Sequence, residues 1–413
     1  MNCHLRPSSD QPLRGEVRLT GSKSESNRLL VLQAFYPSIT LSNISNADDV
    51  RFMQRALGSP DAPEVDIHHA GTAMRFLTAY FSVYPNREVL LTGSHRMKER
   101  PIGILVEALR DLGAEIAYAG EEGFPPLRIH GSVFSKHKVQ LPAEVSSQYI
   151  SALLLIAPSL EKGLEVELIG KITSRPYLEM TLKLLERIGV NTSFEGQHIT
   201  VNPLSEVQQM TIAVESDWSA ASYYYSLVAL SPVGSELHLS VLREDSLQGD
   251  RVLADLYTAF GVETVFQTDG VLLRKTGPHK ASFEADLKDA PDIAQTLAVT
   301  CFGLGMACDM DGLHTLPIKE TDRLAAMKTE LEKFGAEVRI TDKSLHLAAS
   351  SGQFSMASGV EIDTYHDHRM AMAFAPLGLK TGFTIKEAMV VSKSYPDFWK
   401  DWAALGLDAQ LEE

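Results

Sequence analysis

The sequence predicts an α/β protein made of two similar domains, each built from three copies of one repeated unit. Its 413 residues are too many for one ordinary hydrophobic core. An amphipathic helical pattern that ends at a glycine recurs along the chain, and each copy is accompanied by a second, almost entirely apolar helical pattern. A unit of about 70 residues is longer than a solenoid repeat and forms a small α/β module by itself.

The amphipathic helices are recognised by the glycine that follows them. In each copy, apolar residues at helical spacing stop at this glycine and an alternating segment follows, which is typical of a helix, a left-handed C′ residue and a strand. The copies end at Gly58, Gly113, Gly189, Gly261, Gly335 and Gly406. The first and last copies are the weaker ones.

The second kind of helix has no polar face, and a helix of this kind is buried. The predicted segments are 22–35, 71–81, 146–157, 217–230, 291–304 and 367–379. We therefore expect these helices inside each domain, with the amphipathic helices and the sheets outside. The midpoint of the repeat places the hinge near residues 214–217.

Composition limits the possible partners. The net charge of −15 argues against non-specific nucleic-acid binding and against an anionic membrane surface. No run of about 18 uncharged apolar residues occurs, and the N-terminus lacks a signal-peptide pattern, so we expect a cytoplasmic protein. The sequence also lacks Walker, dinucleotide-binding and HExxH motifs. The three cysteines, Cys3, Cys301 and Cys308, have no metal-ligand spacing and are expected to be reduced and buried.

Charged and hydroxyl residues gather where the buried helices begin. A helix N-terminus presents unpaired N–H groups and a partial positive charge, and so favours phosphate or carboxylate ligands. Ordinary capping explains Ser22 and Ser219. It does not explain the cations in the same first turns, which are Lys23, Arg28, Arg75 and Arg369. A cation there costs about 0.3–1 kcal/mol unless an anion offsets it, which favours an anionic ligand.

Three further features fit an anionic ligand. Gly71 has no side chain to block a ligand from the backbone. Arg100 lies in a basic loop before an amphipathic helix. In residues 318–323, Lys319 and Arg323 are four apart and are expected on one helix face, although this pattern taken alone fits a solvated, ion-paired helix face better than a ligand site.

At these residues the sequence resembles the 5-enolpyruvylshikimate-3-phosphate synthases, or 3-phosphoshikimate 1-carboxyvinyltransferases. The matching segments are GSKSESNR (21–28), AGTAMR (70–75), RPIGILVEALR (100–110), SSQYISALLL (146–155), TSRPY (173–177), IKETDRL (318–324), DHRMAM (367–372) and SKSYPDFW (392–399). They follow the family order over nearly the whole chain. The resemblance implies an inside-out α/β barrel, the enolpyruvyl transferase fold, with three βαβαββ units in each domain. It implies an N-terminal domain at 16–215, a C-terminal domain at 1–15 and 216–413, and an active site in the cleft between them.

The resemblance also implies two anionic substrates and no metal or organic cofactor. The residues expected to bind shikimate 3-phosphate are Lys23, Ser24, Arg28, Ser146, Ser147, Gln148, Ser174, Tyr177, Asp292 and Lys319. The residues expected to bind phosphoenolpyruvate are Lys23, Gly71, Arg100, Gln148, Arg323, Arg369 and Lys393. Because these cations come from both halves of the chain, closure of the cleft is expected to assemble the site and exclude water. The protein is expected to be a monomer.

The implied reaction is an addition followed by an elimination, within the shikimate pathway to chorismate and the aromatic amino acids. It needs a base for the 5-hydroxyl of shikimate 3-phosphate and an acid for C3 of phosphoenolpyruvate. We assign Asp292 to the hydroxyl and Glu320 to C3, and Lys23 is a second candidate for either transfer.

The chain departs from the family pattern at several positions. His69 and Phe76 replace the usual Asn and Pro on either side of AGTAMR, and Thr315 replaces an Asn. His69 and Phe76 border Gly71 and leave the glyphosate sensitivity open, whereas Thr315 is expected to weaken one substrate contact. The segment 58–69 is shorter than is usual in the family, which predicts a trimmed hairpin at the surface.

Two other functions remain to be weighed. UDP-N-acetylglucosamine enolpyruvyl transferases share the fold and reaction, but generally carry Lys-Asn where this chain has Lys23-Ser24, and a reactive Cys in a loop that here, at 96–103, has none. A non-catalytic anion-binding homologue is the second, and it has no need of carboxylates beside anionic ligands.

Overall fold

The computed structural model describes residues 1–413 except 8–10, 60, 145, 173–174, 351–358 and 413. The chain forms two compact units, which we call the N-terminal unit (21–214) and the C-terminal unit (1–20 with 215–413). The expected domain start at residue 16 is too early, because β2 (Arg14–Val17) pairs in parallel with β13 (Glu236–Ser240) of the C-terminal unit. The boundary after residue 214 lies one position before the expected one.

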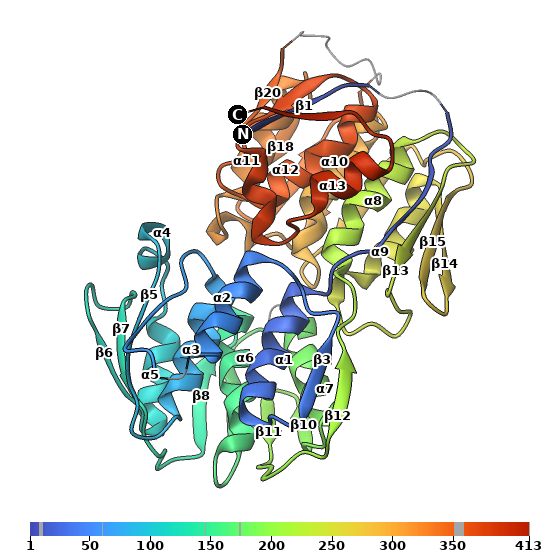
Figure 1. Ribbon diagram of the computed structural model, residues 1–413. Helices are drawn as coiled ribbons and strands as arrows, with labels where there is room; N and C mark the ends of the chain where they lie inside the picture. The colour runs from blue at the N-terminus through green and yellow to red at the C-terminus, as the bar shows by residue number, and fades with distance from the viewer. Residues whose placement is uncertain (8–10, 60, 145, 173–174, 351–358, 413) are drawn as a thin grey trace. The chain divides into compact units, whose positions relative to one another are not determined.

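Three buried helices contact one another in the N-terminal unit (Figure 1). They are α1 (Lys23–Phe35), α3 (Gly71–Ser82) and α6 (Ser147–Ile156). The longer amphipathic helices are α2 (Asp48–Leu57), α5 (Gly103–Leu112) and α7 (Arg175–Arg187). Each amphipathic helix contacts two of the buried helices, so the three amphipathic helices pack around the buried ones. A short helix, α4 (His95–Lys98), precedes α5.

Among its described residues, the strands of this unit form two four-stranded sheets and one two-stranded sheet. The first has the order β4 (Glu64–Asp66), β5 (Glu88–Thr92), β7 (Leu127–His130) and β6 (Glu115–Tyr118). The second has the order β8 (Lys138–Pro142), β9 (Leu164–Ile169), β11 (His198–Val201) and β10 (Thr192–Glu195). In each, a parallel pair is extended by an antiparallel hairpin.

The two-stranded sheet pairs β3 (Ile39–Ser42) with β12 (Met210–Ala213) in parallel. It has no hairpin in the described part of the chain. The described residues of 58–69 contain only β4, and β4 pairs with β5 of the next sheet. The few residues available in this segment leave no room for two further strands.

The C-terminal unit repeats the arrangement. Its mutually contacting buried helices are α8 (Trp218–Leu230), α10 (Ala294–Gly303) and α12 (His368–Phe374) (Figure 1). Its outer helices are α9 (Leu253–Leu256), α11 (Arg323–Lys333) and α13 (Phe398–Ala404). Its sheets have the orders β2-β13-β15-β14, β16-β17-β19-β18 and β20-β21-β1-β22.

The bounds of the remaining strands complete the three sheets. They are β14 (Val262–Gln267), β15 (Gly270–Lys275), β16 (Ser282–Asp286), β17 (Ala307–Asp311), β18 (Val338–Ile340), β19 (Leu345–Leu347), β20 (Glu361–Ile362), β21 (Phe383–Ile385), β1 (Asn2–Leu5) and β22 (Ala409–Glu412). Strand β1 comes from the start of the chain and pairs antiparallel with both β21 and β22.

Two predicted helices of this unit are interrupted. The fourth amphipathic helix is split into η2 (Gly249–Val252), α9 and η3 (Tyr257–Phe260). The last buried helix ends at Phe374, and η6 (Ala375–Leu379) follows. Pro376 explains the second break, because proline has no N–H for the helical hydrogen bond.

The predicted glycine stops are confirmed at all but one position. Positive φ angles occur at Gly113, Gly189, Gly261, Gly335 and Gly406. At Gly58 the expectation of a left-handed residue is wrong, because its φ is −77° and it remains in the right-handed region.

No helix in the described ranges is both long enough and apolar enough for a membrane span.

Candidate active site

Arg323 is the centre of a buried ion-pair cluster in the C-terminal unit. Arg323 is the first residue of α11, and its side chain is only 2% exposed. Its Nε donates to Asp367 Oδ2 at 2.7 Å, its Nη1 to Asp292 Oδ1 at 2.9 Å, and its Nη2 to Glu320 Oε2 at 2.9 Å. Burial alone lowers the pKa of Arg323, but the three carboxylates raise it above its usual value. The guanidinium is therefore permanently charged.

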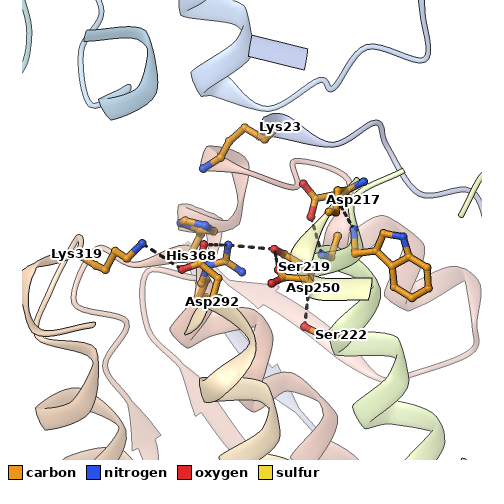
Figure 2. A network of polar contacts seen from close by, with 12 residues as sticks. Lys23, Asp217, Ser219, Ser222, Asp250, Asp292, Lys319 and His368 are labelled. Carbon is orange, nitrogen blue, oxygen red and sulfur yellow. Dashed lines mark hydrogen bonds and ion pairs between the residues drawn. The ribbon is translucent and has the colours of Figure 1, made fainter. Parts of the chain in front are cut away.

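Asp292 gathers three cations around one carboxylate. It lies in η4 (Pro291–Ile293), directly before α10. Its Oδ1 is 3.5 Å from Lys319 Nζ, and its Oδ2 is 3.0 Å from Arg369 Nη2. Burial by itself raises the pKa of Asp292, but the charges of Arg369, Lys319 and Arg323 outweigh burial and hold this pKa well below its usual value. Figure 2 shows Asp292 facing Lys319. The carboxylate is therefore ionised at neutral pH.

Glu320 is held by two cations as well. Besides Arg323, it is paired through Oε1 with Lys393 Nζ at 3.2 Å. Lys393 is buried at the end of η7 (Ala388–Lys393). The cluster therefore joins residues from four segments of the C-terminal unit that are far apart in the sequence.

The expected shared helix face of Lys319 and Arg323 is wrong. Lys319 follows η5 (Leu316–Ile318), and α11 begins only at Arg323, with Asp322 as its N-cap. Both cations still reach Asp292, because the turn after η5 brings Lys319 to it.

Ser219 is not the N-cap of α8, contrary to the sequence interpretation. Asp217 is the N-cap, and its Oδ1 accepts from the N–H of Ala220 at 3.0 Å. The Ser219 hydroxyl donates to Asp250 Oδ2 and accepts from Arg369 Nη2 at 3.3 Å. Ser22, by contrast, caps α1 as expected and accepts from Glu25 N–H.

Arg28 is the most enclosed cation in the described part of the N-terminal site. Its Nη1 donates to the carbonyl of Ser24 at 2.9 Å, and its Nε donates to Thr181 Oγ1 at 2.8 Å. The rings of Phe76 and Tyr177 lie 5.4 Å and 5.9 Å from the guanidinium carbon. Burial lowers the pKa of Arg28 to about 10, so it remains charged at neutral pH. Phe76, a departure from the family pattern, thus packs against Arg28, which is a predicted substrate-binding residue.

Lys23 pairs with Asp49, a residue that the motifs did not indicate. The distance from Lys23 Nζ to Asp49 Oδ2 is 3.7 Å. Asp49 is buried on α2 beside Val50 and Met53. A charged residue on the apolar face of an amphipathic helix is a usable signal, because burial of an unpaired charge is costly.

Gly71 and Arg100 are in close contact. A Cβ atom on Gly71 would lie 2.5 Å from Arg100 Nη1. Arg75 has a structural role at the same helix start, since it donates to the carbonyls of Gly71 at 3.2 Å and Pro101 at 2.9 Å. Gln148 Nε2 donates to Thr72 Oγ1 at 3.2 Å, which joins the starts of α6 and α3.

The first-turn cations therefore have protein partners of their own. Lys23 and Arg369 are paired with carboxylates, and Arg28 and Arg75 donate to carbonyls and hydroxyls. The helix-dipole cost alone thus does not demonstrate a ligand.

Each predicted site residue falls in one of the two units. The N-terminal unit holds Lys23, Ser24, Arg28, Gly71, Arg100, Ser146, Ser147, Gln148 and Tyr177. The C-terminal unit holds Asp292, Lys319, Glu320, Arg323, Arg369 and Lys393. Ser174 lies outside the described residues. Ser146 caps α6, which begins at Ser147.

A family model for EPSP synthase (3-phosphoshikimate 1-carboxyvinyltransferase) matches residues 54–402. The chain belongs to this family. Among curated members, it is 43% identical over 409 residues to the 3-phosphoshikimate 1-carboxyvinyltransferase of Bacteroides fragilis (strain YCH46), with 98% of each chain covered. It is 36% identical over 428 residues to that of Pasteurella multocida (strain Pm70), with 95% of this chain and 96% of the relative covered.

The fold comparison agrees with the family. EPSP synthase from Acinetobacter baumannii superposes with a TM-score of 0.80 at 20% identity, and all of both chains is covered. This match confirms the predicted enolpyruvyl transferase fold. Across the described residues of this EPSP synthase family member, no group of three or more His, Cys, Asp or Glu side chains is placed to hold a metal ion.

Proposed function

We propose that the protein transfers the carboxyvinyl group of phosphoenolpyruvate to the 5-hydroxyl of shikimate 3-phosphate and releases phosphate. Membership of the EPSP synthase family supports the reaction. The observation that carries the chemistry is the ionised Asp292 among Lys319, Arg323 and Arg369. This arrangement supplies a proton acceptor and fixed positive charge in one place. The transfer belongs to the shikimate pathway, which leads to chorismate and the aromatic amino acids.

The reaction has two steps. In the addition, the 5-hydroxyl oxygen bonds to C2 of phosphoenolpyruvate, the hydroxyl proton leaves to a base, and C3 gains a proton. In the elimination, C2 loses phosphate and C3 loses a proton, so the double bond returns. Asp292 accepts the hydroxyl proton and Glu320 serves C3, with Lys23 as the second candidate for either transfer. The surrounding cations stabilise the anionic tetrahedral intermediate.

The two substrates present different anions to the site. The carboxylate of shikimate 3-phosphate binds Arg28 and Ser24, its phosphate binds the hydroxyl and amide groups at the start of α6 with Ser174 and Lys319, and Tyr177 lies along its ring. Phosphoenolpyruvate binds Lys23, Arg100, Arg323, Arg369 and Lys393 beside the backbone of Gly71, with Gln148. Guanidinium groups suit this task because they pair with carboxylate and phosphate through two hydrogen bonds.

Both units contribute to one reaction in this proposal. The cations proposed to bind the two phosphorylated substrates are divided between the two units. Closure around the substrates then excludes water and strengthens each ion pair. The protein acts as a cytoplasmic monomer and uses no metal or organic cofactor.

The proposal is tested by the release of inorganic phosphate from phosphoenolpyruvate. Shikimate 3-phosphate and UDP-N-acetylglucosamine are supplied separately as acceptors. Release with shikimate 3-phosphate alone is the expected result. Release with the UDP-sugar alone would reassign the acceptor, and tight substrate binding without release in either case would favour a binding protein.

Arg28→Lys is expected to raise the KM for shikimate 3-phosphate by about tenfold, and the KM for phosphoenolpyruvate less. Lysine keeps the charge but cannot reproduce the planar set of hydrogen bonds to Thr181 and the Ser24 carbonyl. Steady-state kinetics with each substrate varied measure this difference. Arg187→Lys, at the exposed end of α7, is the matched control, and equal effects of the two changes would remove Arg28 from the site.

Gly71→Ala is expected to raise the KM for phosphoenolpyruvate several-fold. The added methyl group displaces the Arg100 guanidinium, which lies 2.5 Å from the Cβ position. Gly120→Ala is the control, because its Cβ would meet Pro126 Cδ at an ordinary 3.5 Å. An unchanged KM in Gly71→Ala would contradict the proposed role of this contact.

A further inference from the structure

Asp250 is a buried carboxylate that the proposed reaction steps do not use. It lies in η2 and is 5% exposed. Its Oδ2 accepts a hydrogen bond from Ser219 Oγ, and Ser219 Oγ accepts one from Arg369 Nη2 at 3.3 Å. The same Arg369 nitrogen donates to Asp292 Oδ2 at 3.0 Å. Figure 2 shows Asp250 and Ser219 side by side in the network that includes Asp292.

We propose that Asp250, acting through the Ser219 hydroxyl, positions Arg369 for an anionic substrate. The inference rests on the proposed function, in which Arg369 binds phosphoenolpyruvate. Asp250 is a positioning residue, since it acts through Ser219 and not on the substrate.

The direction of the hydrogen bonds gives the physical reason. A serine hydroxyl has one hydrogen and two lone pairs. Ionised Asp250 accepts a hydrogen bond from the Ser219 hydroxyl, so only the lone pairs of Ser219 remain for Arg369. Arginine has donors and no acceptor, and these lone pairs therefore suit it. The long arginine side chain is thereby held before the substrate arrives. A held side chain loses less conformational freedom on binding than a mobile one.

Asp250 faces charged groups from three other elements. Asp217 is the N-cap of α8, Asp292 belongs to η4 and Arg369 to α12. Burial raises the pKa of Asp250 to about 6; the nearby Asp292 and Asp217 raise it too, whereas Arg369 and the Ser219 hydrogen bond oppose the rise.

This protonation gives the positioning a direction in pH. Above about pH 6, Asp250 is ionised and accepts the hydrogen bond of the Ser219 hydroxyl. As pH falls through this value, the protonated carboxyl becomes a donor itself, and the Ser219 hydrogen is free to turn toward Arg369. Positioning is therefore present above the pKa and lost below it.

The test measures kcat and KM for phosphoenolpyruvate at saturating shikimate 3-phosphate across this pH range. The proteins are the wild type, Ser219→Ala, Asp250→Asn and the double variant. Asp255→Asn is the matched control, because Asp255 lies on adjacent α9 with an exposed side chain. Thermal melting of each protein separates loss of folding from loss of positioning.

At about pH 8, each single variant is expected to raise the KM about tenfold and to change kcat less, because one hydrogen bond to a charged group is lost. The double variant is expected to be no worse than Ser219→Ala, since both changes break one chain of contacts. The KM ratio of variant to wild type is expected to approach one below pH 6. The substrate's own phosphate has a second pKa of about 6. Its titration affects the KM of the variant and of the wild type equally and therefore cancels in this ratio.

Three results would overturn the inference. They are a wild-type KM in Ser219→Ala, effects that multiply in the double variant, and a KM ratio that is constant with pH. Ser219→Ala alone decides the question if Asp250→Asn fails to fold. A wild-type protein that releases no phosphate would instead contradict the proposed function, and this inference with it.

Discussion

Asp292→Asn is expected to lower kcat by a factor of about 10²–10⁴, the range of general-base catalysis. The asparagine has nearly the same shape as the aspartate, but it accepts no proton from the 5-hydroxyl. It also removes the negative charge among Lys319, Arg323 and Arg369, so binding of the anionic substrates should be retained or strengthened. Turnover and the two KM values, measured together, separate these effects.

The control for this change is Asp289→Asn, an exposed aspartate in the turn before η4. It should keep wild-type kcat. A wild-type kcat in Asp292→Asn would contradict the assignment of the base. Because cations hold the pKa of Asp292 well below its usual value, it stays ionised as pH falls to about 4. A loss of turnover between pH 7 and 5 therefore has to come from another group.

Arg323→Met is expected to lower the free energy of unfolding by about 3–5 kcal/mol, as when one partner of a buried ion pair is removed. The change leaves Asp292, Glu320 and Asp367 close together without the guanidinium that joins them. Methionine fills part of the volume, so the effect is mainly electrostatic. Denaturant unfolding measures the loss, and turnover should fall with it, since Arg323 is a proposed phosphoenolpyruvate ligand.

The pH dependence of this loss tests its cause. Asp292 has a depressed pKa in the folded protein, so its ion pairs stabilise the fold above its unfolded pKa, and this contribution is lost as pH falls through the folded value. The difference between Arg323→Met and the wild type should accordingly be largest near neutral pH and shrink in acid. Arg339→Met, on the exposed side of β18, should have little effect. A loss that does not change with pH would point to packing instead.

Periodicity made the repeated architecture predictable, because each of the six copies of the repeat shows both helical patterns. All but one of the expected glycines adopt positive φ. Local packing was less accessible. The break of the last buried helix follows from Pro376, but nothing as plain marks the split around α9. The place of β1 beside β21 and β22 depends on contacts between the two ends of the chain, which periodicity does not report.

The motifs pointed to Asp292 and to the cations, and the structure brings Asp292 together with Lys319, Arg323 and Arg369. The partners of those cations were not predictable, because pairing depends on where distant segments meet. The position of Asp49 on the apolar face of α2 marks it as unusual, but it does not name Lys23 as the partner. Ser219 was interpreted as a cap, whereas Asp217 takes that place and leaves Ser219 to link Asp250 with Arg369. A capping pattern in sequence does not say which of two neighbouring polar residues caps the helix.

The central claim is carboxyvinyl transfer, and the fate of the bridging oxygen of phosphoenolpyruvate tests it most directly. Phosphoenolpyruvate labelled with ¹⁸O between C2 and phosphorus is incubated with the protein and shikimate 3-phosphate, and the products are weighed by mass spectrometry. Addition and elimination break the bond between C2 and this oxygen, so we expect the label in the released phosphate and an unlabelled carboxyvinyl ether of shikimate 3-phosphate. Unlabelled phosphate with labelled pyruvate would show simple phosphate-ester hydrolysis and would contradict the account.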